Sequence, residues 1–286
     1  MDLDLSDDGD PKSSFLCACA GRRINLGAAA DNPHPLQLIP AQWRTLRPSL
    51  LEFVDGLALA ETSGGSNGPD VVRSFRQLIY NATELFDGYA NLLPTRVQPR
   101  TKAEKEAVAD FRRTARDLRA FCAVLCNRCK HQGAQMTFLW AASASIGRTG
   151  ARLLVRSYGG GNALLRDDTI HKGAKAGLGF VRLGHELAHN LLRIDRAAGA
   201  LIGKLADDAS EPMERVSATL PIGDALRRLA ALRATRHADE TAMHHGIVFS
   251  NSKLLLVRVA ADSLGPEVNM TANITIESGT HHYSVA

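Results

Sequence analysis

The residues whose types and spacing could perform chemistry lie at His185-Glu186-Leu187-Ala188-His189. Residues four positions apart share one face of an α-helix, so the imidazoles of His185 and His189 could bind one metal ion. Glu186, beside the first histidine, could then act as a general base on a metal-bound water molecule. The pattern predicts a zinc site with His185 and His189 as metal ligands and Glu186 as the catalytic residue.

The segment HELAHNLL resembles the active helix of the zincin metallopeptidases, over eight of the 286 residues. This resemblance implies a zinc-dependent hydrolase that cleaves peptide bonds in a peptide or protein substrate. In the metzincin subtype the third zinc ligand would fall at Asp195. Leu192 stands where that subtype needs a glycine, however, so an uninterrupted helix would turn Asp195 away from the metal.

In the gluzincin subtype the third ligand is a glutamate from a later helix. Residues 237–242 resemble the E-x-x-A-D motif of that helix, although Thr235 stands at the position of the ligand. On a predicted helix from Asp224 to about residue 243, one face carries Glu240 together with two histidines. We expect Glu240 to be the third ligand; the possible substitutes are His237 and His244, and the other carboxylates considered are Glu211 and Glu214.

A different interpretation of the HExxH segment needs no metal. Glu186 lies at helical spacing from Arg182 and Arg193, with which it could form ion pairs on a solvated face that also carries His189 and Arg196. Three arginines on one face would disfavour a bound cation. The sequence leaves both interpretations open.

A second motif closes the predicted helix over residues 102–130. Residues 127–133, NRCKHQG, resemble the R-N-x-x-x-H-G motif of HEPN-type helical domains, many of which are ribonucleases of bacterial defence and toxin systems. Asn127, His131 and Gly133 match the motif. Cys126 takes the place of its arginine, which is expected to stabilise phosphate charge.

The HEPN resemblance therefore implies a noncatalytic helical interaction protein that binds RNA or a protein partner in a bacterial defence or stress system. The same residues also suit an ordinary helix end. Lys130 and His131 would complement the negative end of the helix dipole, and Gly133 would end the helix.

Cys122, Cys126 and Cys129 have the spacing of the radical S-adenosylmethionine cluster loop. Such cysteines must wrap a cluster from a loop, whereas Cys122 and Cys129 fall on the apolar stripe of a predicted helix. Cysteine at such positions behaves as a small hydrophobic residue. We expect core residues and no cluster.

Composition limits the class of protein. The chain is 45% hydrophobic, begins with an acidic stretch that does not resemble a secretory signal, and contains no apolar run of the ~20 residues that a membrane helix needs. Five unevenly placed cysteines favour a reducing compartment. We expect a cytoplasmic bacterial protein without a membrane partner. A net charge of +4 permits contact with nucleic acid but does not indicate it.

Hydrophobic periodicity predicts an α+β fold of helical hairpins, with antiparallel strand pairs in the middle and at the C-terminus. We expect a disordered tail over 1–14, a mainly helical region over 15–133 and an α+β region over 134–286, or one continuous domain from 15 onward. Residues 15–45 suggest short strands or coil, and 63–69 a flexible connection. The predicted helices are 48–60, 72–93, 102–130, 176–205 and 224–243; the predicted strands are 136–144, 152–158, 247–249, 254–259 and 268–276.

Overall fold

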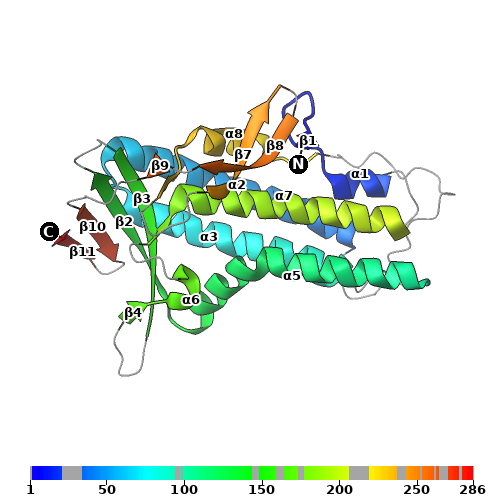
Figure 1. The fold of residues 1–286 in the computed structure, drawn as a ribbon, viewed down its shortest axis with the longest axis horizontal. Helices are drawn as coiled ribbons and strands as arrows, with labels where there is room; N and C mark the ends of the chain where they lie inside the picture. Colours follow the sequence, from blue (N-terminus) through cyan, green and yellow to red (C-terminus); the bar gives the residue numbers. More distant parts are fainter. Residues whose placement is uncertain are drawn as a thin grey trace.

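Long helices form the body of the molecule in the computed structural model (Figure 1). The structure describes residues 2–20, 34–93, 97, 99–143, 148–158, 164–172, 177–205, 219–236, 243–251, 253–260, 262–263, 270–276 and 279–285. The long helices are α2 (Pro35–Ser63), α3 (Gly68–Asp87), α5 (Lys102–His131) and α7 (Phe180–Leu205), and a π-helical turn, η1 (Gly88–Leu92), extends α3. Apolar stripes at helical spacing predicted α3, α5 and α7, and these stripes are buried in the core.

Two sheets pack against the helices. One covers an end of the bundle in the order β11-β10-β2-β3-β4, with β5 also paired to β3. Its strands are β2 (Gln135–Ser143), β3 (Arg148–Tyr158), β4 (Leu164–Arg166), β5 (Leu178–Gly179), β10 (Met270–Ile276) and β11 (Gly279–Val285). The other has the order β1-β8-β7, from β1 (Asp2–Asp4), β7 (Met243–Ser250) and β8 (Lys253–Ala260). The α+β prediction is confirmed.

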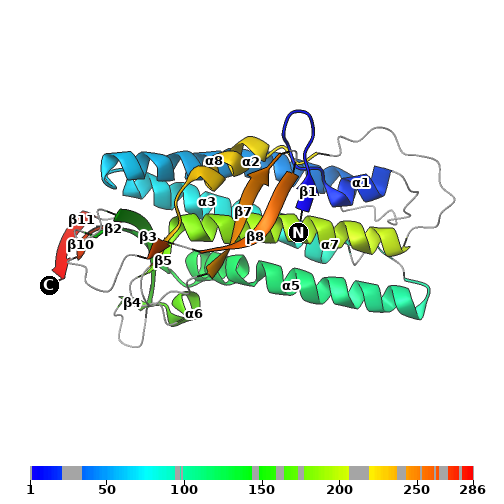
Figure 2. The ribbon, with the colours of Figure 1, turned by 45° about the horizontal axis from the view of Figure 1, so that its top comes forward.

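Short elements complete the described fold. They are α1 (Ser14–Ala20), α6 (Asp168–His171), α8 (Gly223–Ala231), and the parallel pair of β6 (Thr235–Arg236) and β9 (Asp262–Ser263). In Figure 2 the three-stranded sheet crosses over α7, and the N-terminus lies beside β8. The middle hairpin and the C-terminal hairpin join through antiparallel pairing of β2 with β10.

The N-terminal segment is ordered where a disordered tail was expected. β1 pairs with β8, with Asp2 opposite Leu255 and Asp4 opposite Lys253, and α1 begins at Ser14. The disorder prediction is therefore wrong for residues 2–14. Pairing with a strand near the other end of the chain has no local sequence signature, and the acidic composition of the segment hid it.

Of residues 15–45, for which strands or coil were expected, the described parts, 15–20 and 35–45, are helical. Helix α2 begins with Pro35 after the N-cap residue His34, a position where proline loses no hydrogen bond. Pro40 and Pro48 lie inside the helix, and each removes one backbone donor. Burial of a long apolar stripe offsets this loss; its residues are Ile39, Trp43, Leu46, Leu50, Phe53, Val54 and Leu57.

The expected flexible connection over residues 63–69 is a tight turn between α2 and α3. Gly65 adopts φ 83°, and a Cβ there would come within 2.8 Å of the Trp140 ring on β2. A Cβ at Gly68 would come within 2.5 Å of Phe138. These glycines let the turn pack directly against the sheet.

The helix expected over residues 224–243 is much shorter. Helix α8 ends at Ala231, Leu232 is extended, and β6 follows. From Met243 the chain forms β7, which pairs with β8 from Met243–Ala260 to Ser250–Lys253. His244, expected on the helix, therefore lies on a strand.

A buried carboxylate joins the N-terminal arm to the bundle. Asp195 of α7 is 1% exposed, and it accepts hydrogen bonds from the Ser13 hydroxyl at 2.7 Å and the Ser14 N–H at 2.7 Å. The Tyr89 hydroxyl also donates to it at 2.8 Å, and Trp43 Nε1 donates to Tyr89 at 3.0 Å. Burial raises the pKa of Asp195, while these donors oppose that shift.

We expect Asp195→Ala to lower the free energy of unfolding by about 3 kcal/mol, because three buried donors lose their acceptor. Asp117→Ala is the control, since its side chain on α5 is 70% exposed. Urea denaturation of both variants measures the effect. A loss at Asp195 no larger than that at Asp117 would show that the network contributes little.

Candidate functional site

The HExxH segment lies in the middle of α7, and its face is largely buried. Arg182 is 8% exposed, His185 5% and His189 7%, whereas Arg193 is exposed. Glu186 is half-buried and forms no ion pair with any described residue. The interpretation of this segment as an ordinary solvated face is therefore wrong, because Arg182 and His189 face the interior.

His185 is held by a main-chain group of β7. Its Nδ1 accepts a hydrogen bond from the Ile247 N–H at 3.3 Å, and the backbone of Leu229 opposes the lowering of its pKa. β7 is an edge strand of the three-stranded sheet, so the Ile247 N–H has no strand beside it to bond with. In this arrangement the Nδ1 of His185 satisfies an edge-strand donor.

Two further histidines from β7 meet those of α7. The rings of His185 and His244 are 5.7 Å apart in an edge-on arrangement, and those of His189 and His245 are stacked at 4.4 Å. Burial is the main reason that the pKa of His185 is lowered to about 4, and the neighbouring His244 lowers it further. Burial is also the main reason that the pKa of His189 is lowered to about 4, with smaller contributions from His245 and Arg193. Both imidazoles are neutral at pH 7.

The predicted third zinc ligand, Glu240, lies outside the described residues, as do Glu211, Glu214 and His237. His244, a substitute, lies against His185. Among the residues that the structure describes, no three His, Cys, Asp or Glu side chains form a group that could hold a metal ion. Asp195 is engaged with Ser13 and Tyr89 in the core, as expected for a continuous helix. Zinc binding by His185, His189 and Glu240 stays a prediction.

The second motif lies at the C-terminal end of α5. The helix ends at His131, Gly133 adopts φ 63°, and the Ala134 N–H returns to the carbonyl of Arg128. Asn127 and His131 are exposed. This matches the helix end that the sequence indicated.

Aromatic and basic side chains lie together at this helix end. Lys130 Nζ lies 4.5 Å from the centre of the Tyr80 ring, a cation–π contact. Tyr158 of β3 is 54% exposed, and its ring lies beside Gly133, where a Cβ would be 3.6 Å from it. We call Asn127, Lys130, His131, Tyr80 and Tyr158 the α5 end surface.

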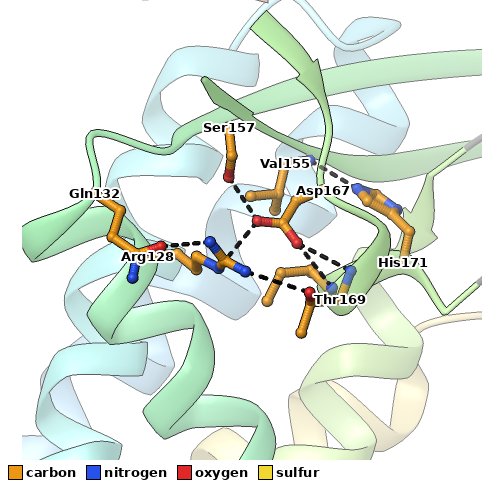
Figure 3. Close-up of polar contacts among 8 residues, drawn as sticks. Arg128, Gln132, Val155, Ser157, Asp167, Thr169 and His171 are labelled. Atoms are coloured by element: carbon orange, nitrogen blue, oxygen red, sulfur yellow. Dashed lines mark hydrogen bonds and ion pairs between the residues drawn. The ribbon is translucent and has the colours of Figure 1, made fainter. Parts of the chain in front are cut away.

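Arg128 is withdrawn from this surface into a polar network (Figure 3). Its Nε lies 3.2 Å from the Asp167 carboxylate, and it also donates to Thr169 and Gln132. The Ser157 hydroxyl of β3 also donates a hydrogen bond to the Asp167 carboxylate, at 2.5 Å. Asp167 thereby joins α5, β3 and α6.

Electrostatics keeps Asp167 ionised. Burial alone would raise its pKa, but the hydrogen bonds from Ser157 and from the N–H groups of Ile170 and Thr169, together with the charge of Arg128, leave the pKa lowered. The N–H bonds show that Asp167 caps α6. Sequence reasoning missed it, although an aspartate before Asp-Thr is typical of a helix N-cap.

The stretch of sequence that contains this network is rich in positive charge. Residues 128–172 contain seven Lys and Arg and two Asp, a formal charge of +5, whereas the whole chain carries +4. The rest of the protein is therefore nearly neutral as a whole. The excess of basic residues over 128–172 can be counted in the sequence, but the small net charge of the whole chain gives no sign of it.

Cys122 and Cys126 are buried, and Cys129 is partly exposed. Burial raises the pKa of Cys122 to about 12. All three lie on α5 and not on a loop, in agreement with the expectation of core residues, although Cys126 and not Cys129 is the second buried member.

The chain matches no family model, and comparisons with curated proteins and with solved structures found no significant match. In the described part of the chain, no helix is both long and apolar enough to cross a membrane. The site therefore has to be judged from its own geometry.

We expect the free energy of unfolding to fall as the pH decreases from 6.5 towards 4. Unfolded histidines protonate near 6.5, whereas His185 and His189 have pKa values of about 4 in the folded protein. The unfolded state therefore binds more protons in this window, and stability is lost on acidification. Urea denaturation between pH 7 and 4 measures the loss. His189→Phe keeps a ring against His245 but cannot titrate, so its loss should be smaller; the exposed His131→Phe control should behave as wild type.

Proposed function

We propose that the protein is a noncatalytic, HEPN-like helical protein that binds single-stranded RNA with the α5 end surface. The observation that carries this proposal is the end of α5, where exposed Lys130 and His131 immediately precede Gly133, against which the exposed ring of Tyr158 lies, and Lys130 contacts the Tyr80 ring. The HEPN-like residues Asn127, His131 and Gly133 lie at the same place.

The chemistry of this surface suits unpaired RNA. Cationic side chains attract the phosphate backbone, and exposed aromatic rings stack on unpaired bases with little sequence preference. Lys130 already rests on the Tyr80 ring, so less side-chain freedom is lost when it meets a phosphate. A protein partner would not require this combination of basic and aromatic groups.

The same geometry favours binding over cleavage. Cys126, at the position of the motif arginine, is buried and carries no guanidinium. Arg128, the nearest alternative, is bonded to Asp167, Thr169 and Gln132. No guanidinium of the α5 end surface is thus available to stabilise charge on a phosphate in the transition state.

A zinc peptidase is less well supported by the geometry of α7. His185 already accepts from the Ile247 N–H through Nδ1, so a metal bound to that nitrogen would displace this hydrogen bond. That change would also leave the Ile247 N–H of an edge strand without its acceptor. We therefore prefer RNA binding as the function.

We expect the protein to bind a fluorescently labelled single-stranded RNA of mixed sequence, with an affinity that falls as salt increases. Tyr158→Ala should weaken binding about 10-fold through lost stacking. Lys130→Ala should weaken binding and lower the slope of log Kd against log salt by about 0.7. Fluorescence anisotropy at several salt concentrations measures both effects.

Lys105→Ala is the matched control for Lys130→Ala. Lys105 is exposed near the opposite end of the same helix, about 40 Å away at a rise of ~1.5 Å per residue. Tyr158→Phe should retain most of the affinity, because it keeps the stacking ring. Equal effects of the Lys105 and Lys130 variants, or wild-type affinity in Tyr158→Ala, would place RNA binding elsewhere or refute it.

We also expect no cleavage of the bound RNA, because the α5 end surface lacks the motif arginine. Incubation of wild-type protein with labelled RNA in EDTA, followed by gel electrophoresis, tests this. Metal-independent cleavage that disappears in His131→Ala would contradict the noncatalytic assignment and indicate an active nuclease.

A further inference from the structure

We propose that the cleft between α1, the first half of α2 and the residues just before α8 binds a small amphipathic carboxylate, an unbranched fatty acid of medium chain length, with its charged group on Arg44. The cleft has a volume of about 440 Å³, which is the size of many small-molecule sites in proteins. It shares no residue with the α5 end surface, so the proposal does not depend on RNA binding.

The walls of this cleft are apolar and come from segments that are far apart in the chain. The apolar side chains that line it include Leu16, Leu36, Trp43 and Leu220. Leu36 is only half-buried. An apolar ligand in the cleft would therefore remove further apolar surface of the protein from water, which favours binding.

Hydrogen bonds hold the walls in place. Trp43 Nε1 donates to the Tyr89 hydroxyl at 3.0 Å, and this hydroxyl donates to the buried carboxylate of Asp195 at 2.8 Å. On the opposite wall, the Leu220 N–H donates to the Pro11 carbonyl at 2.8 Å. Because both walls are ordered before a ligand arrives, little conformational entropy is lost on binding.

A cation lies at the rim of the cleft. Arg44 lines it, is exposed, and forms no hydrogen bond or ion pair with any described residue. The next arginine of α2, Arg47, is instead held by Asp224 at 2.9 Å. The guanidinium of Arg44 is therefore available to a ligand of negative charge.

A carboxylate matches Arg44 better than a phosphate does. The planar guanidinium can donate two parallel hydrogen bonds to one carboxylate. A phosphate monoester would keep oxygens without donors here, because Arg44 is the only charged side chain among the described residues that line the cleft. A cation on the rim of an apolar wall therefore favours an amphipathic monoanion.

The extent of the cleft along α2 indicates the size of the ligand. Gln37 and Arg44 both line it, and they lie seven positions apart on one face of the helix, about 10 Å along its axis. Octanoate and decanoate have about this length when extended. Each methylene group that enters the cleft should tighten binding about 4-fold.

Isothermal titration calorimetry of the full chain with hexanoate, octanoate and decanoate, each below its micelle concentration, tests the proposal. We expect one decanoate per chain and an affinity that rises about 4-fold per methylene along the series. The thermal midpoint should also rise with decanoate, as for any ligand that binds the folded state. Absence of binding, or binding of many molecules with a falling midpoint, would refute the proposal.

Arg44→Gln tests the placement of the carboxylate. We expect decanoate to bind this variant about 10-fold more weakly, because a charged hydrogen-bond donor is lost. Arg112→Gln is the matched control, since Arg112 is exposed on α5, and it should bind as wild type. Decanol carries no charge and should bind wild type and Arg44→Gln equally. Equal affinity of decanoate for wild type and Arg44→Gln would overturn the proposal.

Leu36→Trp tests the placement of the apolar chain. Because Leu36 is half-buried, the larger ring can occupy the cleft without displacing the core, and we expect it to abolish decanoate binding. Its thermal midpoint without ligand, measured by circular dichroism, should stay close to that of wild type. Retention of wild-type affinity in folded Leu36→Trp would place the ligand elsewhere and refute the proposal; if this variant does not fold, the Arg44→Gln comparison decides.

Discussion

The buried carboxylate of Asp195 is the constraint on which the arrangement of the N-terminal arm depends. A carboxylate with 1% exposure is costly unless donors surround it, and here they come from Ser13, Ser14 and Tyr89. Because two of these donors begin α1, the carboxylate fixes that helix on α7. The chain before it is then placed so that β1 can add to β8, which completes the three-stranded sheet beside α7.

That sheet in turn determines what the HExxH segment can do. Its edge strand β7 crosses α7 (Figure 2), and His185 and His189 of the helix contact His244 and His245 of this strand. His185 is used to cover the edge, which also protects an exposed strand from pairing with another chain. Of the two histidines in the segment, only His189 has a buried ring nitrogen, Nδ1, that lacks a hydrogen-bond partner among the described residues.

Local patterns predicted much of the fold, and long-range pairing accounts for the failures. The stripes of α3, α5 and α7 follow from burial of one helix face, which a short window of sequence reveals. The ordered N-terminal segment and β7 depend on β8, and Asp195 meets Ser13 across 182 positions. The spacing of His185 and His189 was visible in the sequence, but the groups that face them from β7 were not.

The same reasoning distinguishes binding from catalysis at the end of α5. Arg128 and Asp167 are both charged, yet they neutralise each other while holding α5, β3 and α6 together. A guanidinium engaged in this way is not free to stabilise charge on a reacting phosphate, because release would leave Asp167 buried without its cation. Lys130 and His131 lack such a structural role and point to solvent, so they remain available to a ligand. The network therefore supports the proposed binding surface and, at the same time, engages the guanidinium that cleavage would require.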